Sequence, residues 1–123
     1  MEEILNKYPL LKDQNVPRET LLEFESFIEM LQKKNEEINI ISKETAKNAV
    51  IRERHIVDSA QVIDLIDLNS NTITDIGSGG GMPGIIISIL TKRLNKTLKS
   101  NLYEKSHHKS AFLRSVSRDL KLN

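Results

Sequence analysis

A cluster of glycines that follows an aspartate is the strongest chemical signal in the sequence: Asp75, then Gly77, Gly79, Gly80 and Gly81. Glycine permits positive φ angles and leaves no Cβ between the backbone and a ligand. A loop that leads from a strand into a helix also directs free N–H groups at whatever it binds. The cluster therefore predicts a cofactor-binding loop. A purely structural turn is the weaker interpretation, because so many glycines cost more chain entropy than a turn requires.

Two kinds of cofactor loop fit these residues. Residues 79–84 match the Gly-x-Gly-x-x-Gly fingerprint of dinucleotide-binding proteins, whereas residues 75–81 match the acidic loop of S-adenosylmethionine methyltransferases. Asp75 favours the second match, since a carboxylate would repel a pyrophosphate but suits a cationic cofactor with an α-amino group and a sulfonium. Glu104 ends the next predicted strand, where an acid binds ribose hydroxyls in either kind of loop.

The elements that must position these residues begin with a β-branched strand over 72–76, which follows a turn cluster. A very apolar segment, 85–94, predicts a helix that is buried on most sides. A second strand over 97–104 and a helix over 106–120 complete the pattern. Strand, glycine loop, helix, strand and helix in this order predict an α/β fold that starts a parallel, doubly wound sheet.

Apolar spacing also predicts which residues of these helices form the core. In the last helix, these are Ala111, Phe112, Leu113 and Val116. Before the glycine loop, two further helices are predicted, over 17–37 and 44–66. The core positions of the first of these recur at helical spacing: Leu21, Phe24, Ile28 and Leu31.

Composition excludes several classes of protein. The 123 residues allow one domain, and the absence of cysteine excludes disulfide scaffolds, cysteine zinc sites and thiolate nucleophiles. No window resembles a membrane span, and the acidic start of the chain argues against a secretory signal. We therefore expect a cytoplasmic protein that does not use a membrane.

Charge is divided unevenly along the chain. Residues 1–91 carry nine Lys and Arg against fifteen Asp and Glu, whereas residues 92–123 carry nine against two. A basic end of this kind suits a polyanion such as RNA, but on charge alone a solvated helix face rich in Lys and Arg is the more ordinary explanation. A flat dependence of binding on salt would exclude phosphate contacts.

Two clusters with histidine need an interpretation. On a helix, His55 shares a face with Asp58 and Ser59, and this group either ties the helix to the domain or faces the substrate. One histidine and one aspartate are too few for a zinc site, so we expect no metal. His107 and His108 stand beside lysines, which favours a solvated basic surface.

The motifs together resemble the RsmG (GidB) family, the guanine-N7 methyltransferases of small-subunit ribosomal RNA. The resemblance begins near Pro17 and extends to the end of the chain. It rests on three stretches: Asn39-Ile40-Ile41-Ser42, Arg54-His55-Ile56-Val57-Asp58-Ser59, and Asp75-Ile76-Gly77-Ser78-Gly79-Gly80-Gly81-Met82-Pro83-Gly84. Proteins of this family have N-terminal helices on a Rossmann-like class I methyltransferase domain. The resemblance thus implies a helical segment over 1–68 and a partial methyltransferase domain over 69–123.

The resemblance also implies roles for individual residues. Gly77 and Met82 would contact S-adenosyl-L-methionine, while Ser78, Gly79 and Gly81 would shape the loop. Asp75 would face the cationic end of the cofactor, and Glu104 matches the ribose-side acid by position alone. The substrate would be a guanine of 16S ribosomal RNA in the small subunit. Its N7 already has an in-plane lone pair, so no general base is assigned and no catalytic residue is predicted.

The length available for the sheet leads to a further expectation. Residues 72–123 have room for two β–α units of ~25–30 residues each. Two units supply two strands, which is fewer strands than the sheet of a class I methyltransferase contains. We therefore expect an incomplete sheet in a truncated chain, without the residues that bind adenine and shape the guanine pocket. Two alternatives to an active methyltransferase stay open: a non-catalytic RNA-binding remnant of the family, and a fragment of a dinucleotide-binding oxidoreductase. The oligomeric state stays open as well.

Overall fold

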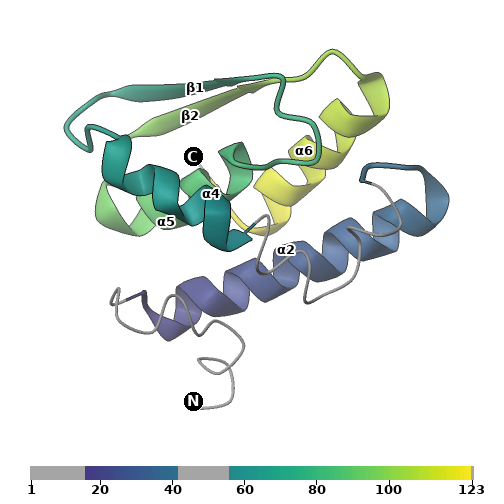
Figure 1. Ribbon diagram of the computed structural model, residues 1–123, viewed down its shortest axis with the longest axis horizontal. Coiled ribbons are helices and arrows are strands. Elements are labelled where there is room, and N and C mark those ends of the chain that lie inside the picture. Colours follow the sequence, from purple (N-terminus) through teal and green to yellow (C-terminus); the bar gives the residue numbers. More distant parts are fainter. Residues whose placement is uncertain (1–15, 42–55, 123) are drawn as a thin grey trace.

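The computed structural model describes residues 16–41 and 56–122 of the chain. Within these ranges the elements follow one another in the order α2 (Arg18–Glu37), α4 (Asp58–Ala60), η3 (Gln61–Leu65), β1 (Thr72–Ile76), α5 (Gly84–Leu94), β2 (Lys99–Tyr103) and α6 (His107–Asp119). Figure 1 shows the two strands in one layer, α5 and α6 beneath them, and α2 beneath these helices. The described residues therefore form a mixed α/β arrangement, which confirms the predicted alternation of strands and helices.

The two strands pair in parallel, with Ile73 opposite Ser100 and Ile76 opposite Tyr103. Parallel neighbours need a crossover connection, and α5 provides it. Alternate side chains of each strand point to opposite faces. One face, which includes Ile73 and Leu102, is half-buried against the helices, and the other is exposed. The predicted strand over 72–76 is confirmed at both ends, and the second strand is shorter than the predicted 97–104.

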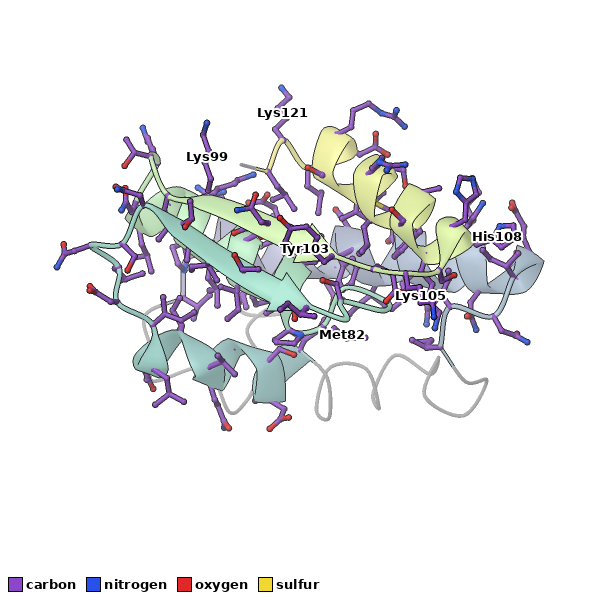
Figure 2. The ribbon with its side chains drawn as sticks, turned by 90° about the horizontal axis from the view of Figure 1, so that it is seen from above. Met82, Lys99, Tyr103, Lys105, His108 and Lys121 are labelled. Atoms are coloured by element: carbon purple, nitrogen blue, oxygen red, sulfur yellow. The ribbon has the colours of Figure 1, made fainter. Side chains whose placement is uncertain are left out.

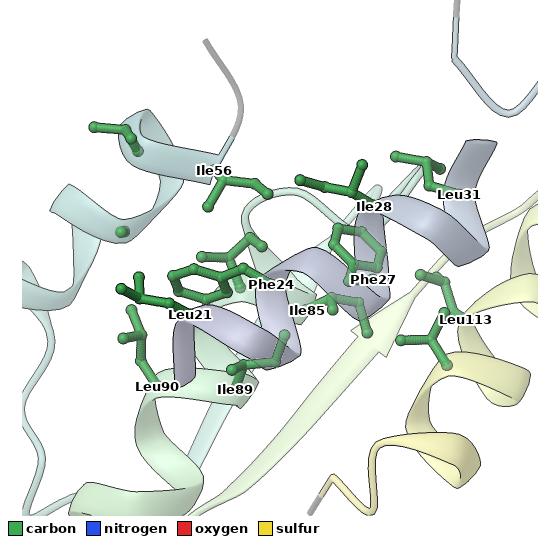
Figure 3. Packing of buried hydrophobic residues seen from close by; sticks show 14 of the residues in the cluster. Leu21, Phe24, Phe27, Ile28, Leu31, Ile56, Ile85, Ile89, Leu90 and Leu113 are labelled. Atoms are coloured by element: carbon green, nitrogen blue, oxygen red, sulfur yellow. The ribbon is translucent and has the colours of Figure 1, made fainter. Parts of the chain in front are cut away.

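The long N-terminal helix α2 forms because its apolar residues recur on one side. Five of its large side chains are almost fully buried: Leu21, Phe24, Phe27, Ile28 and Leu31. Figure 3 shows these side chains along α2, in one hydrophobic cluster with residues of α5 and α6. The helix ends at Glu37, and the side-chain oxygen of Asn35 then accepts hydrogen bonds from the backbone N–H groups of Ile40 and Ile41, at 2.8 and 2.9 Å. The helix predicted over 17–37 is confirmed, and its first helical residue is one position after Pro17.

Helix α5 lies at the centre of the molecule. Its first eight residues, 84–91, are all buried, as the apolar segment predicts. It shares one hydrophobic core with α2 and α6, in which the rings of Phe27 and Phe112 lie 6.3 Å apart. Phe112, Leu113 and Val116 of α6 are buried, but Ala111 is exposed, so its predicted place in the core was wrong. Successive helical residues are rotated by about 100°, which turns position 111 toward solvent.

The predicted helix over 44–66 differs from the structure in its described part. Residues 42–55 lie outside the described ranges, so His55 and Arg54 are not placed. From Asp58 the chain forms a short α-helical turn and then a 3₁₀ helix that ends at Leu65. The N–H of the next residue, Ile66, donates a hydrogen bond of 3.2 Å to the carbonyl of Ile63. A continuous α-helix was therefore the wrong prediction. The β-branched residues and aspartate of this stretch have weak helix propensity.

An ion-pair cluster ties the N-terminal helix to the rest of the fold. Glu23 of α2 accepts hydrogen bonds from Lys92 and from Arg93, the latter at 3.0 Å. Lys92 also donates to the carbonyl of Leu120, at 2.7 Å, just after α6. One carboxylate and two cations thus connect α2, α5 and the end of α6. No helix among the described residues is long and apolar enough to cross a membrane.

Candidate cofactor-binding site

The glycine loop crosses the carboxyl ends of both strands. It leaves β1 at Gly77 and enters α5 at Gly84. The backbone N–H groups of Gly77 and Ser78 both donate to the carbonyl of Tyr103, at 2.8 and 3.0 Å, so the loop is fixed on the last residue of β2. The buried Ser78 hydroxyl donates back to the carbonyl of Asp75, at 3.2 Å. These bonds place the loop where parallel α/β sheets bind their ligands.

The glycines of the loop are required for two different reasons. Gly77, Gly79 and Gly81 have positive φ angles of 77°, 55° and 100°. At Gly77 an added Cβ would meet no atom within 4 Å, so that side of the backbone is open. At Gly81 an added Cβ would lie 2.6 Å from Cγ1 of Ile85. The absence of a side chain at this position therefore allows the loop to pack on α5. Gly77 therefore leaves the solvent side of the loop open, and Gly81 allows the loop to contact α5.

Glu104 connects the loop with the helix that follows β2. Its Oε1 accepts a hydrogen bond from the N–H of Gly79 at 2.9 Å, and its Oε2 accepts one from the N–H of Ser106 at 2.7 Å. The bond from Ser106, and then the bond from Gly79, hold the pKa of this carboxyl below its ordinary value; the charge of Lys109 acts in the same direction. The structure thus brings Gly79 and Glu104 together across 25 positions of sequence.

Asp75 lies on the face of β1 that points toward the helices. Its residue is half-buried, and Oδ2 is fully buried with no hydrogen-bond partner among the described residues. The carboxylate lines a cavity of about 150 Å³ together with Pro83 and Gly84 at the start of α5. An added Cβ at Gly84 would lie 2.5 Å from Oδ2, so only glycine lets the helix come so close.

Met82 and the residues around the loop complete the site. Met82 is partly buried against the core, at the same end of the sheet as Tyr103 and Lys105 (Figure 2). Of the predicted site residues, the loop glycines, Ser78 and Glu104 are linked by contacts, whereas Asp75 approaches from beneath the strand. In the described part of the Arg54–Ser59 stretch, Asp58 is exposed and Ser59 is buried. No group of three or more potential metal ligands occurs among the described residues.

Two groups at the site were not predicted from the sequence. The carbonyl of Tyr103 anchors the loop, but a backbone acceptor has no sequence signal. Ser106 begins α6, and its hydroxyl accepts a hydrogen bond from the N–H of Lys109 at 3.4 Å. A serine directly before a helical pattern is a common N-cap, so this residue was predictable from the sequence.

The comparisons with known proteins agree with these features. Residues 20–123 match the GidB family, described as rRNA small subunit methyltransferase G. Proteins of that name from Pelagibacter ubique and a Ruegeria species are 76% identical over 123 residues and 40% identical over 105 residues. The matches cover 100% and 85% of this chain, but 58% and 50% of those relatives, so the chain spans about half their length. Because the family match includes most of the sequence and the whole glycine loop, the chain belongs to the GidB family.

Proposed function

We propose that the protein takes part in S-adenosylmethionine-dependent methylation of N7 of a guanine in 16S ribosomal RNA. The observation that carries the proposal is the conformation of the loop, in which the Glu104 carboxylate binds the N–H of Gly79. The family match and the names of the relatives support the same reaction. A small-subunit RNA substrate would place the protein in the cytoplasm.

The residues at the loop fit this cofactor in three respects. The open side of Gly77 gives the cofactor access to the backbone, which a side chain would block. The unpartnered Oδ2 of Asp75 can accept a hydrogen bond, either from an amino group or from a bridging water. Each oxygen of Glu104 accepts one backbone bond and has a lone pair left for a ribose hydroxyl. Met82 and Ser78 would then border the site.

The chemistry demands little of the side chains. The cofactor, when bound, supplies an electrophilic methyl group on a sulfonium. Guanine N7 would take this methyl through its in-plane lone pair while the carbon–sulfur bond breaks and S-adenosylhomocysteine leaves, so the chain would have no proton to remove. Its residues act by binding and orienting, which supplies much of the rate in such reactions. Asp75 and Glu104 also place two negative charges near a cationic cofactor, and this favours its binding over that of a pyrophosphate.

The finer assignment of the fold belongs to the same proposal. We infer that β1, α5, β2 and α6 are the first units of a Rossmann-like class I methyltransferase sheet, within a domain over 69–123. The division from a helical segment over 1–68 falls beside a turn in which the N–H of Ser70 donates to the carbonyl of Asp67 at 3.0 Å. The parallel pairing and the crossover through α5 support this assignment.

Calorimetric titration of the 123-residue chain with S-adenosylhomocysteine tests the proposal. We expect saturable micromolar binding that Glu104→Gln weakens at least tenfold. The matched control Glu29→Gln removes an equal charge from an exposed position on α2 and should leave the affinity unchanged. Absence of binding at millimolar concentration would overturn the proposal for this chain. Tight binding of a nicotinamide dinucleotide instead would favour the oxidoreductase alternative, and RNA binding without either cofactor would favour the RNA-binding remnant.

A further inference from the structure

The cations of the basic end of the chain differ in what they contact. Lys92 and Arg93 both pair with Glu23, so they already have a structural role, although Arg93 is partly exposed. Four others are exposed and form no ion pair with any residue that the structure describes: Lys99, Lys105, Arg114 and Lys121. The positive charge available to a partner is therefore concentrated on β2, on α6 and beside the glycine loop.

Helix α6 arranges part of this charge in a line. Its core side carries Phe112 and Val116, and Arg114 and Arg118 lie four residues apart on the opposite side. His107 is two turns before Arg114 on the same side. Among the described residues, Arg118 forms an ion pair with its neighbour Asp119 alone, a 3.7 Å contact in which both side chains are mostly exposed, at 79% and 57%. Such a pair contributes little, so Arg118 stays available for a partner.

The remaining cations extend this line at both ends. In Figure 2, Lys99 and Lys121 extend from the same edge of the molecule, on the side of β2 that does not pair with β1. Lys105 lies at the other end, beside the loop that carries Met82. Helix α6 has 13 residues, which corresponds to a length of about 20 Å. Positive charge therefore follows the helix from the candidate cofactor site to the far end of β2.

A groove between α6 and β2 gives this surface one place where hydrogen-bond donors converge. It has a volume of about 220 Å³, and its polar lining includes Arg114, Ser100, Ser110 and Ser117. The three serine hydroxyls and the guanidinium have no hydrogen-bond partner among the described residues. A guanidinium beside hydroxyl donors is a combination that binds phosphate oxygens.

We propose that the exposed side of α6, with Lys105, Lys99 and Lys121 at its ends, binds the sugar-phosphate backbone of RNA and leads it to the glycine loop. The inference rests on the proposed function for the identity of the polyanion. A guanidinium binds phosphate and carboxylate oxygens alike, so RNA is preferred to an acidic protein because of the proposed function and because the charge follows one continuous line, as the phosphates of a strand do. Phosphate contacts of this kind fix the position of a nucleic acid without reading its sequence.

Salt-dependent binding distinguishes these contacts from a general effect of charge. The probe is a fluorescently labelled single-stranded oligonucleotide of 16S rRNA sequence, measured by anisotropy between 50 and 300 mM KCl. Each phosphate contact contributes about 0.7 to the slope of log K against log salt for a single strand. Arg114→Gln with Lys121→Gln should therefore lower the slope by about 1.4, which corresponds to a loss of about 25-fold in affinity at 0.1 M salt.

The matched control removes two exposed cations from α2 instead, as Arg18→Gln with Lys33→Gln. It should leave the slope within about 0.3 of the unsubstituted chain, well below the change expected for loss of two contacts. Equal effects of the two double variants, or no change in slope, would overturn the inference, as would polyglutamate that competes as well as RNA. Affinity for S-adenosylhomocysteine is read separately: if it is absent while the slopes differ as expected, the proposed function fails and the RNA surface stands.

Discussion

Gly77→Ala and Gly81→Ala should separate the two reasons for glycine in the loop. Both residues have positive φ, so alanine at either position costs about 1–2 kcal/mol of backbone strain. At Gly81 the new Cβ would also lie 2.6 Å from Cγ1 of Ile85 and 3.1 Å from Cδ2 of Leu113. Both neighbours are buried, and overpacking of this kind costs a further ~1–3 kcal/mol.

The two substitutions should therefore have opposite rankings in two measurements. Gly81→Ala should lower the free energy of unfolding by about 2–5 kcal/mol and Gly77→Ala by about 1–2 kcal/mol. Binding of S-adenosylhomocysteine should show the reverse order among molecules that are still folded, because the Cβ at Gly77 would enter the open side of the loop. Urea unfolding followed by circular dichroism gives the first quantity, and calorimetry below the unfolding transition gives the second.

Gly80→Ala is the matched control for both measurements. Gly80 does not have a positive φ, and its added Cβ would lie 3.2 Å from side-chain methyl groups of Ile40 and Ile41. A small adjustment of these groups is opposed by the lower entropy that alanine gives the unfolded chain. We expect a change within about 1 kcal/mol. If Gly77→Ala destabilises the chain as much as Gly81→Ala, the contact with Ile85 is not what requires glycine, and the reasoning fails.

Three further results are expected. Because the N–H of Ser106 and then a loop N–H hold the pKa of Glu104 below its ordinary value of 4.5, its stabilisation is present above that pH and is lost as the pH falls through the folded pKa. The unfolding midpoint should thus depend less on pH below 4.5 in Glu104→Gln than in the unsubstituted chain. Glu23→Gln removes the carboxylate that pairs with two cations, which should cost about 1–2 kcal/mol in urea unfolding and less in 1 M NaCl. Phe27→Ala should lower the free energy of unfolding by about 3–5 kcal/mol, against about 0.5 kcal/mol for the exposed Leu22→Ala.

Elements with a strong local signal were predictable almost to the residue. The strand over 72–76 is β-branched and ends at a glycine, and both of its ends were correct. Helix α2 follows Pro17 with a regular apolar stripe, and its predicted start differed by one residue. In these stretches the local backbone preference and the burial pattern favour the same structure, so tertiary packing does not alter the predicted element.

Stretches in which these signals disagree were predicted less well. Residues 58–65 carry apolar residues at helical spacing, but β-branched side chains and Asp64 oppose a regular α-helix, and a 3₁₀ helix results. Ala111 was assigned to the core because alanine and its neighbours are apolar, although the rotation of the helix places it outside. The ion pairs of Glu23 depend on residues 69 and 70 positions away, which no local pattern reveals.

The two acids of the candidate site show what strand periodicity adds to a motif. Asp75 and Ile73 are two residues apart in β1, so both side chains point toward the helices, and the burial of Oδ2 follows from this alternation. Glu104 lies just beyond β2 and is free of that constraint, which lets one carboxylate bind both the loop and the start of α6. The motif predicts that both acids lie at a cofactor. Their geometry differs, because Glu104 approaches from the loop side, whereas Asp75 approaches from beneath, against the start of α5, where glycine at position 84 lets the helix come close.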